Sequence, residues 1–292
     1  MKRGINIFYR NCMKVKYSSL QVWSKGSQIL ETMESKEFEW YLAGLIDSIG
    51  IIKVPLSKKI HPLHTPKIII RLKKTEMQLL ESIKKVLDTR CQNILIPSTI
   101  TKKEKNYIDL EITDLNLLIL IINMVKNKLM TIQIGEMNNL INYINIITPI
   151  FVKNNKRERY LSKLIYSKGY NKSNIIDIND IQNIEYPFSN KEGLEKQKQI
   201  ITSSWLRALI DTKGNYAYKE YKISLTSNNK KGYNNQFIMG KLSLIFKYYY
   251  YKDETKKMYH IHITSLESQE ILLQYLDDYP LLTSKYNRLR SN

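Results

Sequence analysis

One sequence pattern occurs twice in the chain and restricts its fold more than any other feature. Residues 40–50 read Trp-Tyr-Leu-Ala-Gly-Leu-Ile-Asp-Ser-Ile-Gly, and residues 205–214 read Trp-Leu-Arg-Ala-Leu-Ile-Asp-Thr-Lys-Gly. Aligned on Asp47 and Asp211, the two copies share Leu, Leu-Ile-Asp and Gly at an offset of 211 − 47 = 164 residues. A repeat at this spacing in a chain of 292 residues predicts two similar halves.

The residues that follow each copy carry the same order of elements. After the first copy, hydrophobic periodicity predicts strands at 51–56 and 67–72, a helix at 75–87, strands at 93–97 and 107–112, and a helix at 114–125. After the second copy it predicts strands at 216–221 and 222–226, a helix at 235–246, strands at 248–251 and 258–264, and a helix at 265–276. A further helical pattern covers 129–147. We therefore expect an α+β fold with two αββαββα halves.

The expected domain organisation follows from this repeat. It comprises a basic leader or arm at 1–36, a first half at 37–150, a linker or insertion at 151–202 and a second half at 203–292. Residues 1–30 contain basic side chains but no Asp or Glu, which is typical of a mitochondrial presequence and equally of an arm that lies along phosphates. Both interpretations favour an organelle, and we expect the mitochondrial matrix.

Small residues recur four positions apart in both copies of the motif. They are Gly44 with Ser48 and Ala208 with Thr212. Residues at i and i+4 share one face of a helix, and small side chains there allow two helix backbones to approach closely. The pattern predicts that the two motif helices pair face to face about an internal pseudo-twofold axis in a monomer. The glycine that ends each copy suits a tight exit from the helix into the next strand.

The charge of the chain points to a polyanionic partner. There are 46 Lys and Arg against 27 Asp and Glu, so the formal charge is 46 − 27 = +19. Nucleic acid is the usual partner for such a surplus, with a membrane surface second, and no apolar run is long enough to span a bilayer. Cys12 and Cys91 have no paired spacing, and the histidines (His61 with His64, His260 with His262) lack further metal ligands nearby. We expect no cofactor and no metal.

At this point the chain resembles the LAGLIDADG family of homing endonucleases and intron maturases. Residues 42–50 match the signature, residues 206–214 match it again, and the resemblance covers about 37–286. The stretch at 275–285 also resembles the closing helix of family members encoded in organellar introns. The resemblance implies two αββαββα halves whose signature helices pair at the centre, while two antiparallel sheets form a saddle over nucleic acid.

The chain departs from the family pattern at the positions of the catalytic acids. The resemblance implies one Asp or Glu at the eighth signature position of each half, where the two carboxylates hold divalent metals. Here these positions are Ile49 and Lys213. Isoleucine offers no lone pair, and an ammonium group repels the cation that it would replace. Glu37 and Glu220 do not occupy the required positions. We expect no catalytic residues and no cleavage.

The loss of the acids leaves the expected binding surface in place. The candidate nucleic-acid-binding lysines and arginine of the first half are Lys53, Lys58, Lys59, Lys67, Arg71, Lys73, Lys102, Lys103 and Lys105. Those of the second half are Lys219, Lys222, Lys230, Lys231, Lys247, Lys252, Lys256 and Lys257. Interleaved tyrosines that are expected to stack on unpaired bases or pack on ribose include Tyr107, Tyr216, Tyr218, Tyr221, Tyr248, Tyr250 and Tyr259.

Three functions remain open on the sequence. The first is an inactive RNA-binding scaffold in an organelle, either as a maturase-like splicing factor for a group I intron or as a structural component of the mitochondrial ribosome. Its partners would be intron or ribosomal RNA, with ribosomal or splicing proteins. The second is a metal-dependent DNA homing endonuclease with unusual ligands. The third is a DNA-binding regulator that does not cut.

Overall fold

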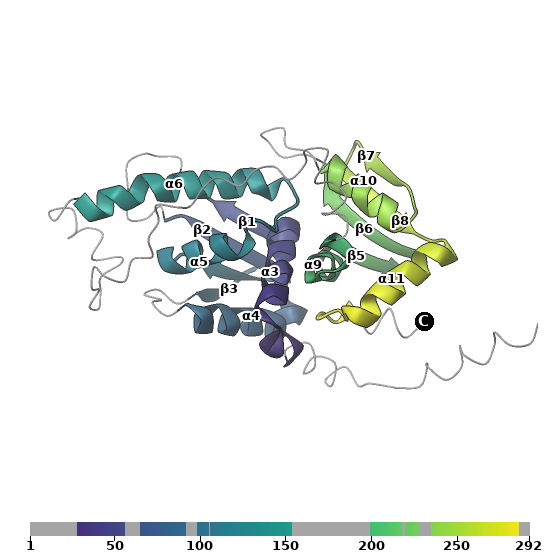
Figure 1. Ribbon diagram of the computed structural model, residues 1–292, viewed down its shortest axis with the longest axis horizontal. Helices are drawn as coiled ribbons and strands as arrows, with labels where there is room; N and C mark the ends of the chain where they lie inside the picture. Colours follow the sequence, from purple (N-terminus) through teal and green to yellow (C-terminus); the bar gives the residue numbers. More distant parts are fainter. Residues whose placement is uncertain are drawn as a thin grey trace, which may run out of the picture.

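The computed structural model describes residues 28–55, 65–91, 98–104, 106–153, 199–217, 220–227 and 235–285. Figure 1 shows two groups of helices and strands on either side of a central pair of helices, α3 and α9. The predicted leader and linker fall mainly on 1–27 and 154–198, which lie outside the described residues.

The first half contains the expected helices and a single antiparallel sheet. Its elements are α3 (Ser35–Ile49), β1 (Gly50–Lys53), β2 (Lys67–Lys73), the 3-10 turn η1 (Lys74–Glu76), α4 (Met77–Arg90), β3 (Thr99–Glu104), β4 (Tyr107–Ile112), α5 (Leu115–Val125) and α6 (Gln133–Lys153). The strand order is β1-β2-β4-β3. Asp114 caps the N-terminus of α5, because its side chain accepts a hydrogen bond from the Leu117 amide at 3.0 Å.

The second half repeats this arrangement. Its elements are α9 (Ser204–Lys213), β5 (Gly214–Ala217), β6 (Glu220–Thr226), α10 (Gln236–Ile245), β7 (Tyr250–Asp253), β8 (Met258–Ile263) and α11 (Leu266–Asp278). The strand order β5-β6-β8-β7 matches that of the first sheet, and every pairing is antiparallel. The predicted α+β fold with two αββαββα halves is confirmed.

The strand predicted at 93–97 lies outside the described residues, and β3 (Thr99–Glu104) is the strand that pairs with β4. One predicted strand boundary was wrong. The break expected between Tyr221 and Lys222 falls earlier, because Tyr221 already pairs with Ile263 inside β6.

Each sheet packs one face against the helices of its half. The opposite face is called the open face of the sheet. In β2 and β4 the buried side chains that pack in the core alternate, and they are Ile68, Ile70, Leu72, Ile108, Leu110 and Ile112. In β6 and β8 the equivalent residues are Tyr221, Ile223, Leu225, Tyr259, Ile261 and Ile263. The two halves share one continuous apolar core through α3 and α9. No helix in the described ranges is long and apolar enough to cross a membrane.

The two motif helices are in closer contact than any other two helices of the described residues. A Cβ atom at Gly44 would overlap the main-chain carbonyl oxygen of Trp205 and lie 2.8 Å from the Cβ atom of Ala208. Gly44 and Ala208 occupy equivalent positions, since 208 − 44 = 164. Ser48 and Thr212 instead donate hydrogen bonds to carbonyl oxygens of their own helices. The close approach therefore depends on the Gly44 and Ala208 pair.

The glycines that end the motif helices are required by space. Gly50 has φ −64° and ψ 139°, and Gly214 has φ −68° and ψ 140°, which are conformations that other residues adopt freely. A Cβ atom at Gly50 would lie 2.5 Å from the Ile46 carbonyl oxygen, and one at Gly214 would lie 2.5 Å from the Ile210 carbonyl oxygen. The chain turns so sharply into each strand that no side chain fits there.

Candidate nucleic-acid interface

The aspartate of the first motif faces inward and is surrounded by donors. The carboxylate of Asp47 accepts hydrogen bonds from the Met130 amide (2.6 Å), the Thr131 amide (3.2 Å), the Thr131 hydroxyl (2.6 Å) and the Trp205 indole N–H (2.8 Å). Desolvation by burial raises the pKa of Asp47 to about 6, against the lowering effect of these hydrogen bonds. The hydrogen bonds from Met130 and Thr131 hold the end of α3 against the segment before α6.

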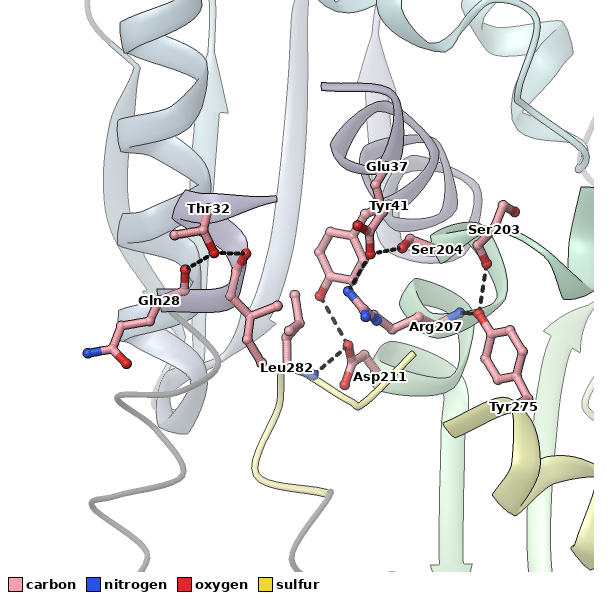
Figure 2. A network of polar contacts seen from close by, with 11 residues as sticks. Gln28, Thr32, Glu37, Tyr41, Ser203, Ser204, Arg207, Asp211, Tyr275 and Leu282 are labelled. Atoms are coloured by element: carbon pink, nitrogen blue, oxygen red, sulfur yellow. Dashed lines mark hydrogen bonds and ion pairs between the residues drawn. The ribbon is translucent and has the colours of Figure 1, made fainter. Parts of the chain in front are cut away.

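The aspartate of the second motif makes the equivalent set of contacts. Asp211 accepts hydrogen bonds from the Leu282 amide (3.1 Å), the Thr283 amide (3.1 Å), the Thr283 hydroxyl (2.6 Å) and the Tyr41 hydroxyl (3.1 Å). Figure 2 shows Tyr41 and Leu282 converging on this carboxylate. Burial raises the pKa of Asp211 above its usual value. Both aspartates are therefore structural.

The two motif helices are joined by a hydrogen bond in each direction. Tyr41 lies on α3 and donates to the aspartate of α9, while Trp205 lies on α9 and donates to the aspartate of α3. The two donors occupy equivalent positions, since 205 − 41 = 164. The reciprocal pair of hydrogen bonds fixes the rotation of each motif helix relative to the other. The sequence analysis missed this pair, although both aromatic residues stand six positions before the motif aspartates.

The positions of the family's catalytic acids lie at the ends of the paired helices. Ile49 is half-buried and packs against the core. Lys213 is also half-buried, its pKa is lowered by desolvation, and it has no hydrogen bond or ion pair within the described part of the chain. Beside them, the Gly50 carbonyl accepts a hydrogen bond from the side-chain amide of Gln133 at 3.0 Å. The Gly214 carbonyl accepts one from the Lys285 ammonium group at 2.6 Å. One half thus presents an alkyl group with an amide, and the other presents two ammonium groups.

This chemistry does not fit a divalent metal ion. Magnesium and calcium take oxygen ligands, predominantly carboxylates, and neither Ile49 nor Lys213 supplies one. Glu37 lies 12 residues before Ile49, or about 18 Å along α3, where it accepts from the Ser204 hydroxyl at 2.8 Å and pairs with Arg207 at 3.2 Å (Figure 2). Glu220 contacts the imidazole of His262. Among the described residues, no three His, Cys, Asp or Glu side chains are grouped to hold a metal.

The open face of the first sheet is basic, but part of its charge is paired. Alternation along β2 puts Lys67, Arg71 and Lys73 on the face opposite the core, and the register of β1 adds Lys53 to it. Lys67 pairs with Glu111 at 2.9 Å, while Arg71 makes two hydrogen bonds, of 2.7 and 2.9 Å, with the buried Asp109.

Lys53 and Lys73 are exposed and have no acidic partner among the described residues. The four basic and two acidic side chains on this face of β1, β2 and β4 leave a charge of 4 − 2 = +2. The first sheet therefore has two cations ready to contact a phosphate backbone.

The open face of the second sheet is not basic. On β5 to β8 its charged side chains are Lys222, Glu220 and Asp253, for a charge of 1 − 2 = −1 with neutral histidines. The other candidate lysines that the structure describes in this half lie at the edge of the sheet. Lys247 pairs with Glu267, Lys252 pairs with Glu254, Lys256 pairs with Asp253, and Lys257 has a positive φ of 51° in the turn before β8.

The candidate tyrosines do not gather on the open faces as predicted. Tyr216 and Tyr250 pack partly buried against the core, because they pair with Tyr221 and Ile261, whose side chains point to the helices. Tyr221 and Tyr259 are buried in that core, and Tyr107 is exposed on the open face of the first sheet. The Tyr248 hydroxyl accepts from the Thr264 hydroxyl at 2.7 Å.

The aromatic residue on the open face of the second sheet is Tyr251, which the sequence analysis did not select. Its neighbours there are His260 and His262, which share a face as their alternation predicts. The alternation of β7 identifies Tyr251 once the strand is aligned with β8, since Tyr251 pairs with His260.

The remaining candidates cannot be placed on either face. Lys58, Lys59, Lys105, Tyr218, Lys219, Lys230 and Lys231 lie outside the described residues, as do His61, His64 and Cys12. Lys102 and Lys103 belong to β3, whose side chains there are likewise outside the description. Cys91 is buried.

Comparisons with known proteins agree with this architecture. Residues 208–291 match the family model described as LAGLIDADG endonuclease. The meganuclease I-SmaMI bound to uncleaveable DNA is similar at 15% identity and a TM-score of 0.56, over 86% of this chain and 88% of its own. I-SmaMI bound to cleaved DNA is similar at 16% identity and a TM-score of 0.55, over 86% of both chains. I-AabMI bound to uncleaved DNA is similar at 18% identity and a TM-score of 0.53, over 86% of this chain and 87% of its own. No curated protein sequence matches the chain.

The two sheets and the paired helices thus form the fold of the two-domain meganucleases. Residues 208–291 match the LAGLIDADG endonuclease family by sequence, and both halves together have the fold of the LAGLIDADG meganucleases.

Proposed function

We propose that this protein is a LAGLIDADG-fold nucleic-acid-binding scaffold that does not cleave, and that its ligand is structured RNA in an organelle. The observation that carries the proposal is the chemistry at the ends of α3 and α9. Ile49 and Lys213 occupy the acid positions, while the only aspartates of the motifs, Asp47 and Asp211, each accept four hydrogen bonds in the interior. No carboxylate of the motifs is left to bind a metal.

Binding does not require these acids, because affinity for nucleic acid comes largely from phosphate contacts. The formal charge of +19 and the unpaired cations Lys53 and Lys73 on the first open face supply such contacts. The lysine at position 213 adds a positive charge at the centre of the fold, where a phosphate would otherwise meet a metal ion. The fold is thereby suited to hold a polyanion without reacting with it.

The proposed ligand is one structured RNA, and the proposed location is the mitochondrial matrix. The RNA is a group I intron or a ribosomal RNA, so the protein acts as a maturase-like splicing factor or as a structural component of the mitochondrial ribosome in the matrix. Ribosomal or splicing proteins are further partners, and the protein is a monomer. The acid-free basic sequence at 1–30 supports the organellar location.

A DNA-binding regulator that does not cut is the second candidate. It is favoured by the structural relatives, which are meganucleases described as bound to DNA. A metal-dependent endonuclease is the third, and it requires ligands other than Ile49 and Lys213.

Cleavage is tested with a library of duplex DNA substrates and magnesium. We expect no specific double-strand cuts at nanomolar protein, since no carboxylate is available to bind the ion. The double variant Ile49→Asp with Lys213→Asp is the matched control, because it returns one acid to each helix end. Specific magnesium-dependent cuts by the wild-type protein would contradict the proposal.

The choice between RNA and DNA is tested by competition. In a filter-binding titration we expect structured RNA to displace duplex DNA of equal length from the protein. Equal affinity, or tighter binding of duplex DNA, would favour the DNA-binding regulator instead.

A further inference from the structure

An aromatic cluster on the open face of the second sheet has no role in the fold or at the helix ends. The ring of Tyr251, on the edge strand β7, lies 5.2 Å from the His260 ring and 5.3 Å from the His262 ring, both on the neighbouring strand β8. The ammonium group of Lys222, on β6, lies 6.0 Å from the centre of the same ring. The tyrosine side chain therefore extends across the sheet over β8 instead of pointing away from its edge.

The cluster is held in place from below. The His260 Nδ1 atom is hydrogen-bonded to the Ser224 hydroxyl at 2.8 Å, and His260 is 4% exposed. The His262 Nε2 atom is hydrogen-bonded to the Tyr251 hydroxyl at 2.9 Å, and its Nδ1 atom contacts Glu220. These bonds fix the orientation of Tyr251, so less conformational entropy is lost when a ligand packs on it.

The tyrosine ring itself remains accessible. Tyr251 is 48% exposed, although its ring already contacts two histidines. Desolvation lowers the pKa of both histidines below the usual value, and Lys222 lowers that of His260 further, while Asp253 opposes this shift. The surface beneath the ring is therefore uncharged imidazole at neutral pH, with one cation at its side.

We propose that Tyr251, supported by His260 and His262 and flanked by Lys222, is a stacking site for one unpaired nucleotide of the bound RNA. An aromatic face stacks on any base, and a flanking ammonium group contacts the phosphate of the same nucleotide. The inference rests on the proposed function, because it names the part of the RNA that this sheet contacts.

The two open faces then have different tasks. The first sheet, with Lys53 and Lys73, contacts phosphates irrespective of base pairing. The second sheet carries a charge of −1 on its strands and gains little from phosphates alone. Bases inside a duplex stack on one another and do not expose their faces, so the Tyr251 site selects a loop or bulge over a continuous duplex.

The test uses the full-length protein and two RNA probes. One is a hairpin with 2-aminopurine at a loop position, and the other is a fully paired duplex of the same stem. The variants are Tyr251→Ala, which removes the ring, and Tyr251→Phe, which keeps the ring but loses the hydroxyl. Tyr249→Ala is the matched control, since Tyr249 is 85% exposed and its ring contacts Tyr248. Thermal unfolding verifies that each variant is folded.

We expect Tyr251→Ala to weaken hairpin binding by about tenfold, the range for loss of one stacked base. Tyr251→Phe should lose less affinity than Tyr251→Ala, because it keeps the ring and loses only the bond to His262. Tyr249→Ala should stay within about twofold of the wild type, and duplex binding should not change. Quenching of the 2-aminopurine fluorescence on binding should disappear in Tyr251→Ala alone.

Two results would overturn the inference while leaving the proposed function intact. One is hairpin binding by Tyr251→Ala that equals that of the wild type, and the other is an equal loss in Tyr249→Ala. A wild-type protein that binds neither RNA probe as tightly as duplex DNA would overturn the proposed function itself, and the stacking site with it.

Discussion

Replacing Gly44 with alanine tests the close packing of the two motif helices. The new methyl group would overlap the main-chain carbonyl oxygen of Trp205 and lie 2.8 Å from the Cβ atom of Ala208. Because a main-chain atom is involved, α3 and α9 have to move apart. Overpacking of this kind costs about 1–3 kcal/mol or more, and the higher helix propensity of alanine returns at most about 1 kcal/mol. We expect Gly44→Ala to lower the free energy of unfolding by about 2 kcal/mol.

The matched control is Gly240→Ala in the middle of α10. A Cβ atom at Gly240 meets only Cε1 of Tyr250, at 3.9 Å, which is an ordinary van der Waals contact. The same substitution there should therefore raise the free energy of unfolding by about 0.5–1 kcal/mol. Urea unfolding of the wild type and both variants, followed by circular dichroism, measures the two effects. A Gly44→Ala variant that is as stable as Gly240→Ala would refute the close approach of the helices.

Four further predictions concern the hydrogen bonds of Asp47 and the open face of the first sheet. Trp205→Phe removes the indole donor to the buried Asp47 and should cost about 1.5–3 kcal/mol in urea unfolding, the range for a hydrogen bond to a charged group. An unchanged midpoint would contradict the hydrogen bond between α9 and the aspartate of α3. The pKa of Asp47, about 6 in the folded state, lies above its unfolded value near 4, so the folded state keeps the proton to higher pH. The contribution of Asp47 to the free energy of unfolding should therefore fall by about 3 kcal/mol as pH rises from about 4 to about 6. Asp47→Asn should remove this pH dependence from the free energy of unfolding, measured by urea unfolding at each pH. Lys73→Ala should leave the free energy of unfolding unchanged. It should lower the slope of log RNA affinity against log salt concentration by about one, the contribution of one phosphate contact. Arg71→Ala should instead lower the free energy of unfolding by about 3–5 kcal/mol, because it leaves Asp109 buried and unpaired.

The duplicated motif predicted the fold because it combines several independent requirements in few residues. Gly44 and Ala208 allow close helix approach, and the glycines at 50 and 214 allow the sharp exit into a strand. Each requirement is local, so it can be read from a short stretch of sequence. The strand patterns that follow are less specific, which is why the boundary between β5 and β6 was expected at Tyr221, a residue that lies inside β6.

The sequence analysis failed where a side chain's role depends on strand parity or on a distant partner. Tyr250 and Tyr251 are adjacent and chemically identical, yet one packs in the core and the other lies on the open face. Arg71 resembled a free cation, but its partner Asp109 lies 38 residues away. Neither distinction is visible until the register of the sheet is known.

A second internal repeat also escaped notice. The segments Leu129-Met-Thr131 and Leu281-Leu-Thr283 both supply the amides and the hydroxyl that hold a motif aspartate. They stand at different distances from their aspartates, with each threonine 84 residues from Asp47 and 72 from Asp211. Because the intervals differ, a search at the fixed offset of 164 residues does not align them, although the shared Leu-x-Thr pattern is a signal.

Crosslinking in cells tests the central claim of an RNA scaffold most directly. The tagged protein is irradiated with ultraviolet light in intact organelles, purified under denaturing conditions, and the attached nucleic acid is sequenced. We expect the reads to concentrate on one structured RNA, either a group I intron or a ribosomal RNA, with the wild type and not with an unrelated basic matrix protein. Recovery of DNA without RNA, or of RNA no more concentrated than with that control protein, would contradict the account.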